Sequence, residues 1–221
     1  MTSQWVDWSK TTRSKDYRGS DSFATLMIIG PTCFFLGILF ASFPYDYPLL
    51  WTSDPVSPAY FDQLETHLRF IHSAPPLIAR LLNIMIFLGF LGFFIKLFRP
   101  SEANVLFDGA SLVLYVIGTG VYITNIVKGM RAVAAGAWDQ PGFEGTAHDG
   151  PVTGRVTLGR EDSLSVLSAS NTILALVLLG VLVLQVGQWY AERKELDETE
   201  AMERREAELA AKGGSGKRKS Q

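Results

Sequence analysis

Long apolar blocks separated by polar segments organise this sequence. The apolar residues gather in four segments, 23–43, 77–98, 105–127 and 167–190. An α-helix rises about 1.5 Å per residue and the hydrocarbon core of a bilayer is about 30 Å thick, so roughly 20 apolar residues suffice to cross it. The pattern therefore predicts an all-α membrane protein, a bundle of four transmembrane helices.

Polar tails flank the predicted membrane domain. Residues 1–22 form an N-terminal tail, residues 23–190 the membrane domain and residues 191–221 a C-terminal tail. The N-terminal tail lacks the short apolar core of a cleavable signal peptide, so we expect the first span to act as the insertion signal. Acidic and basic residues alternate in the C-terminal tail, which predicts a charged helix, and residues 213–216 have the composition of a linker.

The distribution of charge predicts the orientation. The chain has 20 basic and 22 acidic residues, a near balance that gives no reason to expect a nucleic-acid partner. Basic residues concentrate in the two tails and in the turn after the second span, where Lys96 and Arg99 stand. The other two loops, 44–76 and 128–163, carry fewer, so the positive-inside rule places both termini in the cytosol.

The polar residues inside the spans offer little chemistry. Arg80 and Asp108 lie within about one turn of a span end, where a side chain can reach the headgroups. The remaining polar groups are neutral, and such groups join helices by hydrogen bonds more often than they catalyse reactions. No zinc-protease helix, phosphate-binding loop or nucleophile elbow occurs, so we expect neither an enzyme nor a cofactor.

Two histidines and one cysteine are the candidates for metal or redox chemistry. His67 and His72 are five residues apart, which places them poorly on one helical face, so a metal site is not favoured. Cys33 is the single cysteine and lies within an apolar block. It predicts a buried, inert thiol and excludes an intramolecular disulfide.

Glycines mark predicted contact faces of the spans, because a missing side chain lets two helices approach closely. The contact can be between the four spans or with the helices of another protein, and glycine alone does not distinguish the two. The pairs recur at seven residues in the first and fourth spans and at three in the second: Gly30 and Gly37, Gly180 and Gly187, Gly89 and Gly92.

Short motifs beside the spans carry a family resemblance. They are Pro44-Tyr45-Asp46-Tyr47 with Leu49-Leu50, Phe61-Asp62 with the two loop histidines, Ile95-Lys96-Leu97-Phe98 with Pro100, Leu106-Phe107, Ser111-Leu112 with Leu114-Tyr115, Thr124-Asn125, and Gly187 with Trp189-Tyr190. Together with the four-span layout, they resemble the fungal endoplasmic reticulum chaperone that packages amino-acid permeases, the secretory component SHR family. The resemblance covers about residues 23–190.

The resemblance implies a multi-pass protein of the endoplasmic reticulum membrane that assists the folding of amino-acid permeases and their packaging into COPII vesicles. The implied partners are the permeases, COPII coat components on the cytosolic face and the lipid bilayer. Client binding is then expected within the spans, at polar groups that helix association uses. The candidates are Asn83, Ser111, Tyr115, Asn125 and Asn171, with Pro44, Tyr45, Asp46 and Tyr47 as the family-motif loop.

Two alternatives to this chaperone stay open, a small four-span transporter or channel and a structural membrane scaffold. A transporter would need a charged or polar path at mid-depth, which the spans lack. At the C-terminal end, Lys217 and Lys219 have the spacing of a cytosolic dilysine retrieval signal. A solvated basic tail is the competing interpretation.

Overall fold

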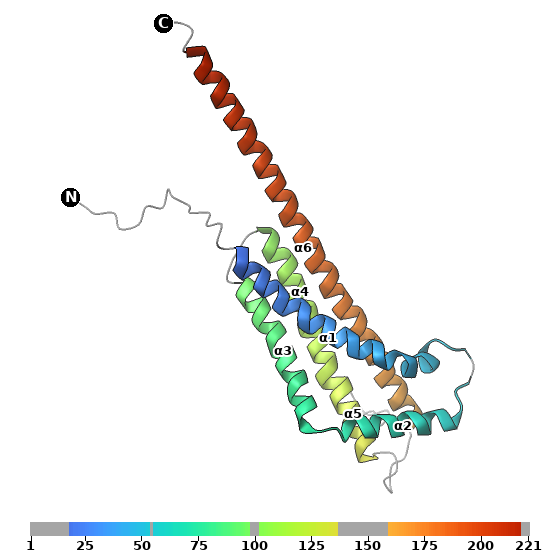
Figure 1. The fold of residues 1–221 in the computed structure, drawn as a ribbon. Coiled ribbons are helices and arrows are strands. Elements are labelled where there is room, and N and C mark those ends of the chain that lie inside the picture. The colour runs from blue at the N-terminus through green and yellow to red at the C-terminus, as the bar shows by residue number, and fades with distance from the viewer. Residues whose placement is uncertain (1–17, 54, 98–101, 137–158, 218–221) are drawn as a thin grey trace, which may run out of the picture.

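The computed structural model describes residues 18–53, 55–97, 102–136 and 159–217. Within these ranges the chain is helical and contains no strand (Figure 1). The elements are α1 (Arg18–Leu50), α2 (Pro58–His72), α3 (Pro76–Leu97), α4 (Glu102–Val121), the π-helix η2 (Tyr122–Val127), α5 (Lys128–Ala135) and α6 (Arg160–Lys217).

Four helices are long and apolar enough to cross a membrane, which confirms the predicted all-α four-span bundle. They are Phe23–Leu50, Pro76–Leu97, Leu106–Ala135 and Arg160–Leu209. The third is continuous through α4, η2 and α5. The side of the membrane on which the termini lie stays a prediction.

The bundle has two distinct ends (Figure 1). α1 packs against α3 and α6, while α4 packs against α6 and less extensively against α3. At one end, here called the tail end, α1 and α4 begin, α3 finishes and α6 leaves the bundle. At the other, the loop end, α2 lies across the bundle and contacts α5 and the start of α6.

Helix α2 lies in a segment that the apolar blocks left as a loop. Ser57 precedes it and Pro58 occupies its first turn, where a missing backbone N–H costs nothing. Phe61 and Leu64 are buried three residues apart, as in an amphipathic helix, and face the bundle. The loop end is therefore capped by ordered helix.

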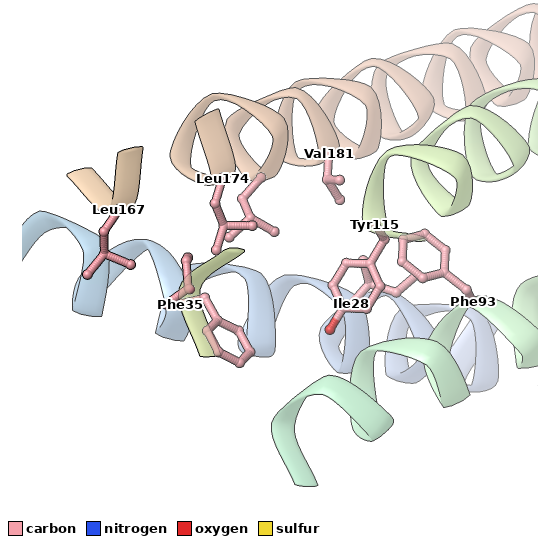
Figure 2. Packing of buried hydrophobic residues seen from close by; sticks show 9 residues of the cluster. Ile28, Phe35, Phe93, Tyr115, Leu167, Leu174 and Val181 are labelled. Carbon is pink, nitrogen blue, oxygen red and sulfur yellow. The ribbon is translucent and has the colours of Figure 1, made fainter. Parts of the chain in front are cut away.

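Aromatic and aliphatic side chains from α1, α3, α4 and α6 form the core (Figure 2). Tyr115 is 2% exposed, and its ring contacts Phe90 and Phe93 at centroid distances of 5.0 and 5.4 Å. The Tyr115 hydroxyl donates to the Ile86 carbonyl at 3.3 Å. This ring joins α3 to α4.

The glycines divide into packed and unpacked positions. A Cβ at Gly89 would lie 2.2 Å from Tyr115 Oη, and one at Gly92 would lie 2.9 Å from the Ala24 carbonyl oxygen. Gly180 and Gly187 likewise contact side chains of α4, so the predicted contact role is confirmed for all four. As a contact between spans of this chain, it is wrong for the pair in α1, Gly30 and Gly37, because no heavy atom lies within 4 Å of either added Cβ.

Two further expectations are corrected. Cys33 is exposed on the outer surface of α1 and is not buried, because α1 packs against its neighbours through other faces. Helix α6 continues through residues 213–216 to Lys217, so the predicted linker is helical. Lys219 lies outside the described residues, and the retrieval signal stays a prediction.

Candidate functional site

A buried polar cluster occupies the tail end of the bundle. Lys96 Nζ, from α3, lies 3.2 Å from Asp108 Oδ1 of α4. The same ammonium donates to Gln185 Oε1 and Gln188 Oε1 of α6, at 3.0 Å each. The side chains of Lys96 and Asp108 are 3% and 2% exposed. Three spans thus meet around one ion pair.

The amide groups of α6 complete this tail-end cluster. Gln185 Nε2 donates to Asp108 Oδ1 at 3.1 Å and to Ser111 Oγ at 3.2 Å. Gln188 Nε2 donates to Asp108 Oδ2 at 2.9 Å and to Glu192 Oε1 at 3.0 Å. A buried ion pair is tolerated only when hydrogen bonds satisfy its remaining donors and acceptors, and these amides supply them.

The tail-end cluster corrects the expected positions of two charges. The sequence pattern placed Lys96 in a cytosolic turn and let Asp108 reach the headgroups, yet both face the bundle interior. A signal for Lys96 exists in α3, where Gly89, Phe93 and Lys96 recur at four and three residues and all are buried. The lysine therefore extends the packing face of its helix.

A second set of charges ties α2 to the loop end. Arg160, at the start of α6, contacts Asp62 Oδ1 at 2.6 Å and Glu65 Oε2 at 2.7 Å. Glu65 also pairs with Arg69, whose Nε donates to the Val133 carbonyl of α5 at 3.2 Å. This loop-end set is more exposed than the tail-end cluster: the Arg160 side chain is 31% exposed and that of Asp62 is 69% exposed.

The family-motif residues 44–47 occupy the last turns of α1 and are not a loop. The Tyr45 ring stacks on His67 of α2 at a centroid distance of 4.0 Å, so this histidine is packed. Tyr60 Oη donates to the Tyr45 carbonyl at 2.7 Å, and burial raises the pKa of Tyr60, which keeps this donor protonated. Asp46 is 5% exposed and accepts from Asn171 Nδ2 at 3.1 Å.

A cavity of about 170 Å³ lies beneath α2, between α1, α3, η2 and α6. Its wall is apolar except for Ser42, Asn171 and the phenol of Tyr122. An apolar cavity of about 150 Å³ stays dry and accepts a benzene-sized group. This space is lined mainly by apolar side chains and therefore suits an apolar group.

Four of the five candidate client-binding residues are enclosed or hydrogen bonded within this chain, and the fifth is not. Ser111 and Tyr115 are fully enclosed in the bundle, at 0% and 2% exposure. Asn125 Nδ2 donates to Ser170 Oγ at 3.2 Å, and Asn171 bonds Asp46 as above, so these amides join helices of this chain. Asn83 differs: it is exposed on α3, and its side chain makes no hydrogen bond with any other residue that the structure describes.

Metal binding finds no support in the described part of the chain. No group of three or more histidine, cysteine, aspartate or glutamate side chains there could hold an ion. The two loop histidines lie on α2, and His67 is stacked on Tyr45.

The helices, their lengths and their internal ion pair define a multi-pass α-helical membrane protein. A family model described as "ER membrane protein SH3", for the SHR3 chaperone family, matches residues 19–221, and the chain belongs to this family. It is 25% identical over 202 residues to the "Secretory component protein psh3" of Schizosaccharomyces pombe, covering 90% of this chain and 85% of that relative. No solved structure matches.

Membership confirms the family suggested by the span-end motifs. The protein is a multi-pass protein of the endoplasmic reticulum membrane and belongs to a chaperone and secretory-component family, which is not a family of enzymes.

Proposed function

We propose that this protein binds newly inserted amino-acid permeases in the endoplasmic reticulum membrane, assists their folding and supports their packaging into COPII vesicles. The observation that carries the proposal is the family match across residues 19–221, joined by a relative named as a secretory component. Permeases contain broken helices and polar groups that face lipid until later spans arrive. A partner that packs against these spans would shelter them.

The distribution of polar groups supports a chaperone over a transporter. A transport path needs accessible polar or charged groups at mid-depth. Here the buried charges of the spans have partners within the protein. Lys96 and Asp108 bind each other and the α6 amides, Asp46 accepts from Asn171, and the cavity beneath α2 is mainly apolar. Contacts between helices in a bilayer are individually weak, so a client held by them can be released.

The proposal includes an orientation in which both tails are cytosolic. Helix α6 leaves the tail end as a long charged stem, in which Lys194 and Glu198 approach to 4.0 Å and Arg204 and Glu200 to 3.9 Å. COPII components would contact this side. A glycosylation acceptor inserted at Gly145 should be modified and one at Gly214 should not. The opposite pattern would show that the proposed orientation is wrong.

The client claim is tested by translating one amino-acid permease into microsomes that contain or lack this full-length chain. We expect the permease to stay soluble in mild detergent only with the chaperone present, whereas a single-span membrane protein should be indifferent. Removal of residues 201–221 should preserve permease solubility while reducing entry into COPII vesicles. Equal permease aggregation with and without the full-length chain would refute the proposed function.

A further inference from the structure

The outward face of α3 is one of the least enclosed surfaces of the membrane domain. In the most apolar stretch of helix α3 17% of the residues are buried, the same share as in the span Leu106–Ala135, against 39% for the α1 span and 33% for the α6 span. Arg80, Asn83 and Phe87 lie on this face at spacings of three and four residues, which aligns them along one side of a helix. We call these three residues the α3 stripe. Phe87 is 68% exposed.

The α3 stripe places polar groups where lipid would surround them. Helix α3 begins at Pro76, and at about 1.5 Å per residue Arg80 lies roughly 6 Å and Asn83 roughly 10 Å along it. A long arginine can extend toward the headgroups from that position, but the short asparagine side chain cannot. Neither side chain makes an ion pair or hydrogen bond with another residue within the described ranges.

An unsatisfied amide in hydrocarbon is unfavourable, because nothing there replaces its hydrogen bonds to water. We propose that the α3 stripe binds a transmembrane helix of the client that carries a carboxylate, with Arg80 and Asn83 hydrogen bonding that group and Phe87 packing beside it. This inference rests on the proposed function and names the surface through which the client is held.

The chemistry of the α3 stripe selects this occupant. A lipid acyl chain has neither a donor nor an acceptor for Asn83. A second copy of this chain, paired symmetrically through α3, would bring two Arg80 cations together in a medium of low dielectric, where like charges repel strongly. A carboxylate complements both groups, because a guanidinium binds it through two parallel hydrogen bonds and the amide donates another.

The outward face of α6 offers a matched comparison surface. Between Val166 and Val186 the exposed residues of α6 are all apolar, with Leu176 at 64% exposure and Val183 at 62%. Leu176 and Phe87 are therefore similar in exposure and in the absence of charge. They differ in the presence of Arg80 and Asn83 beside Phe87.

The experiment places a photoreactive p-benzoylphenylalanine at Phe87, or at Leu176, of the full-length chain in microsomes during translation of an amino-acid permease. We expect permease adducts from position 87 to exceed those from position 176 several-fold. Asn83→Leu should reduce the adducts from position 87 several-fold, Arg80→Glu should reduce them further, and Asn83→Gln, which keeps the amide, should restore them. Equal detergent solubility of the variants checks that each one folds.

The other outcomes separate the surface from the function. Adducts that are equal or stronger from position 176, or unaffected by Asn83→Leu, overturn the α3 stripe while the client claim stands. Adducts formed from position 87 only with a second copy of this chain also overturn it. Lipid adducts alone from both positions, together with permease aggregation in the presence of the chaperone, overturn the proposed function itself.

Discussion

The two charged regions of this protein use similar side chains at opposite ends of one bundle. At the tail end, Lys96 and Asp108 are 3% and 2% exposed and surrounded by amides. At the loop end, Arg160 is 31% exposed and its partner Asp62 is 69% exposed. The attraction between charges is weakened by water, and so is the penalty for separating them. The tail end is therefore fixed, whereas the loop end is held by contacts that solvent can compete for.

The difference assigns different roles to the ends. The tail-end cluster joins α3, α4 and α6, three of the four spans, and determines their relative rotation. The loop-end set holds α2 over a cavity of about 170 Å³. Leu68 and Ile71 of α2 line part of that cavity. Movement of α2 would change access to that cavity without disturbing the helices at the tail end.

The largest expected effect comes from breaking the buried pair. Lys96→Met leaves Asp108 charged, enclosed and without its cation, so we expect a loss of about 3–5 kcal/mol of stability. The readout is thermal unfolding of the purified protein in detergent. Lys194→Met is the matched control, because that lysine is 68% exposed and its ammonium is as far as 4.0 Å from the Glu198 carboxylate. Its loss should change stability by less than about 0.5 kcal/mol.

A double variant sharpens this first test. Lys96→Met combined with Asp108→Leu removes both charges and should recover part of the loss, because no uncompensated ion remains. If Lys96→Met matches its exposed control, the tail end does not depend on the pair.

The second prediction concerns the close approach of α3 and α1. Gly92→Ala adds a Cβ that would lie 2.9 Å from the backbone oxygen of Ala24, so the helices must shift, and we expect a loss of about 1–3 kcal/mol. Gly37→Ala, with no atom within 4 Å of the new Cβ, should be neutral in the same unfolding assay. Equal losses from both variants would show that the close approach of α1 is not what makes alanine unfavourable at position 92, because alanine has the higher helix propensity at both sites.

The smallest effect is expected at the loop end. Arg160→Gln removes two partly exposed ion pairs and should lower global stability by only about 1 kcal/mol. Hydrogen exchange should nevertheless accelerate in α2, and raising the ionic strength of the wild-type protein should do the same by screening. Exchange near Lys96 should not respond to salt. An α2 as protected in Arg160→Gln as in the wild type would make the two ends equivalent.

Local features of the sequence determined much of the fold. The length of an apolar block decides whether a helix can cross a bilayer, and that length needs no knowledge of neighbours. Four spans could therefore be counted correctly. Helix α2 was left as a loop, although its signals are present in the sequence: Ser57-Pro58 begins it, and Phe61, Leu64 and Leu68 follow at helical spacing.

The rotation of each span could be decided only by the tertiary structure. Lipid tails are as apolar as leucine, so a transmembrane helix can be apolar on its inner and outer faces alike, and periodicity does not distinguish them. Gly30 and Gly37 carry the same glycine signal as Gly89 and Gly92, yet only the α3 pair meets a neighbour. Lys96 resembled a cytosolic anchor because its amide partners stand 89 and 92 residues away, and only packing of α6 against α3 and α4 brings them together.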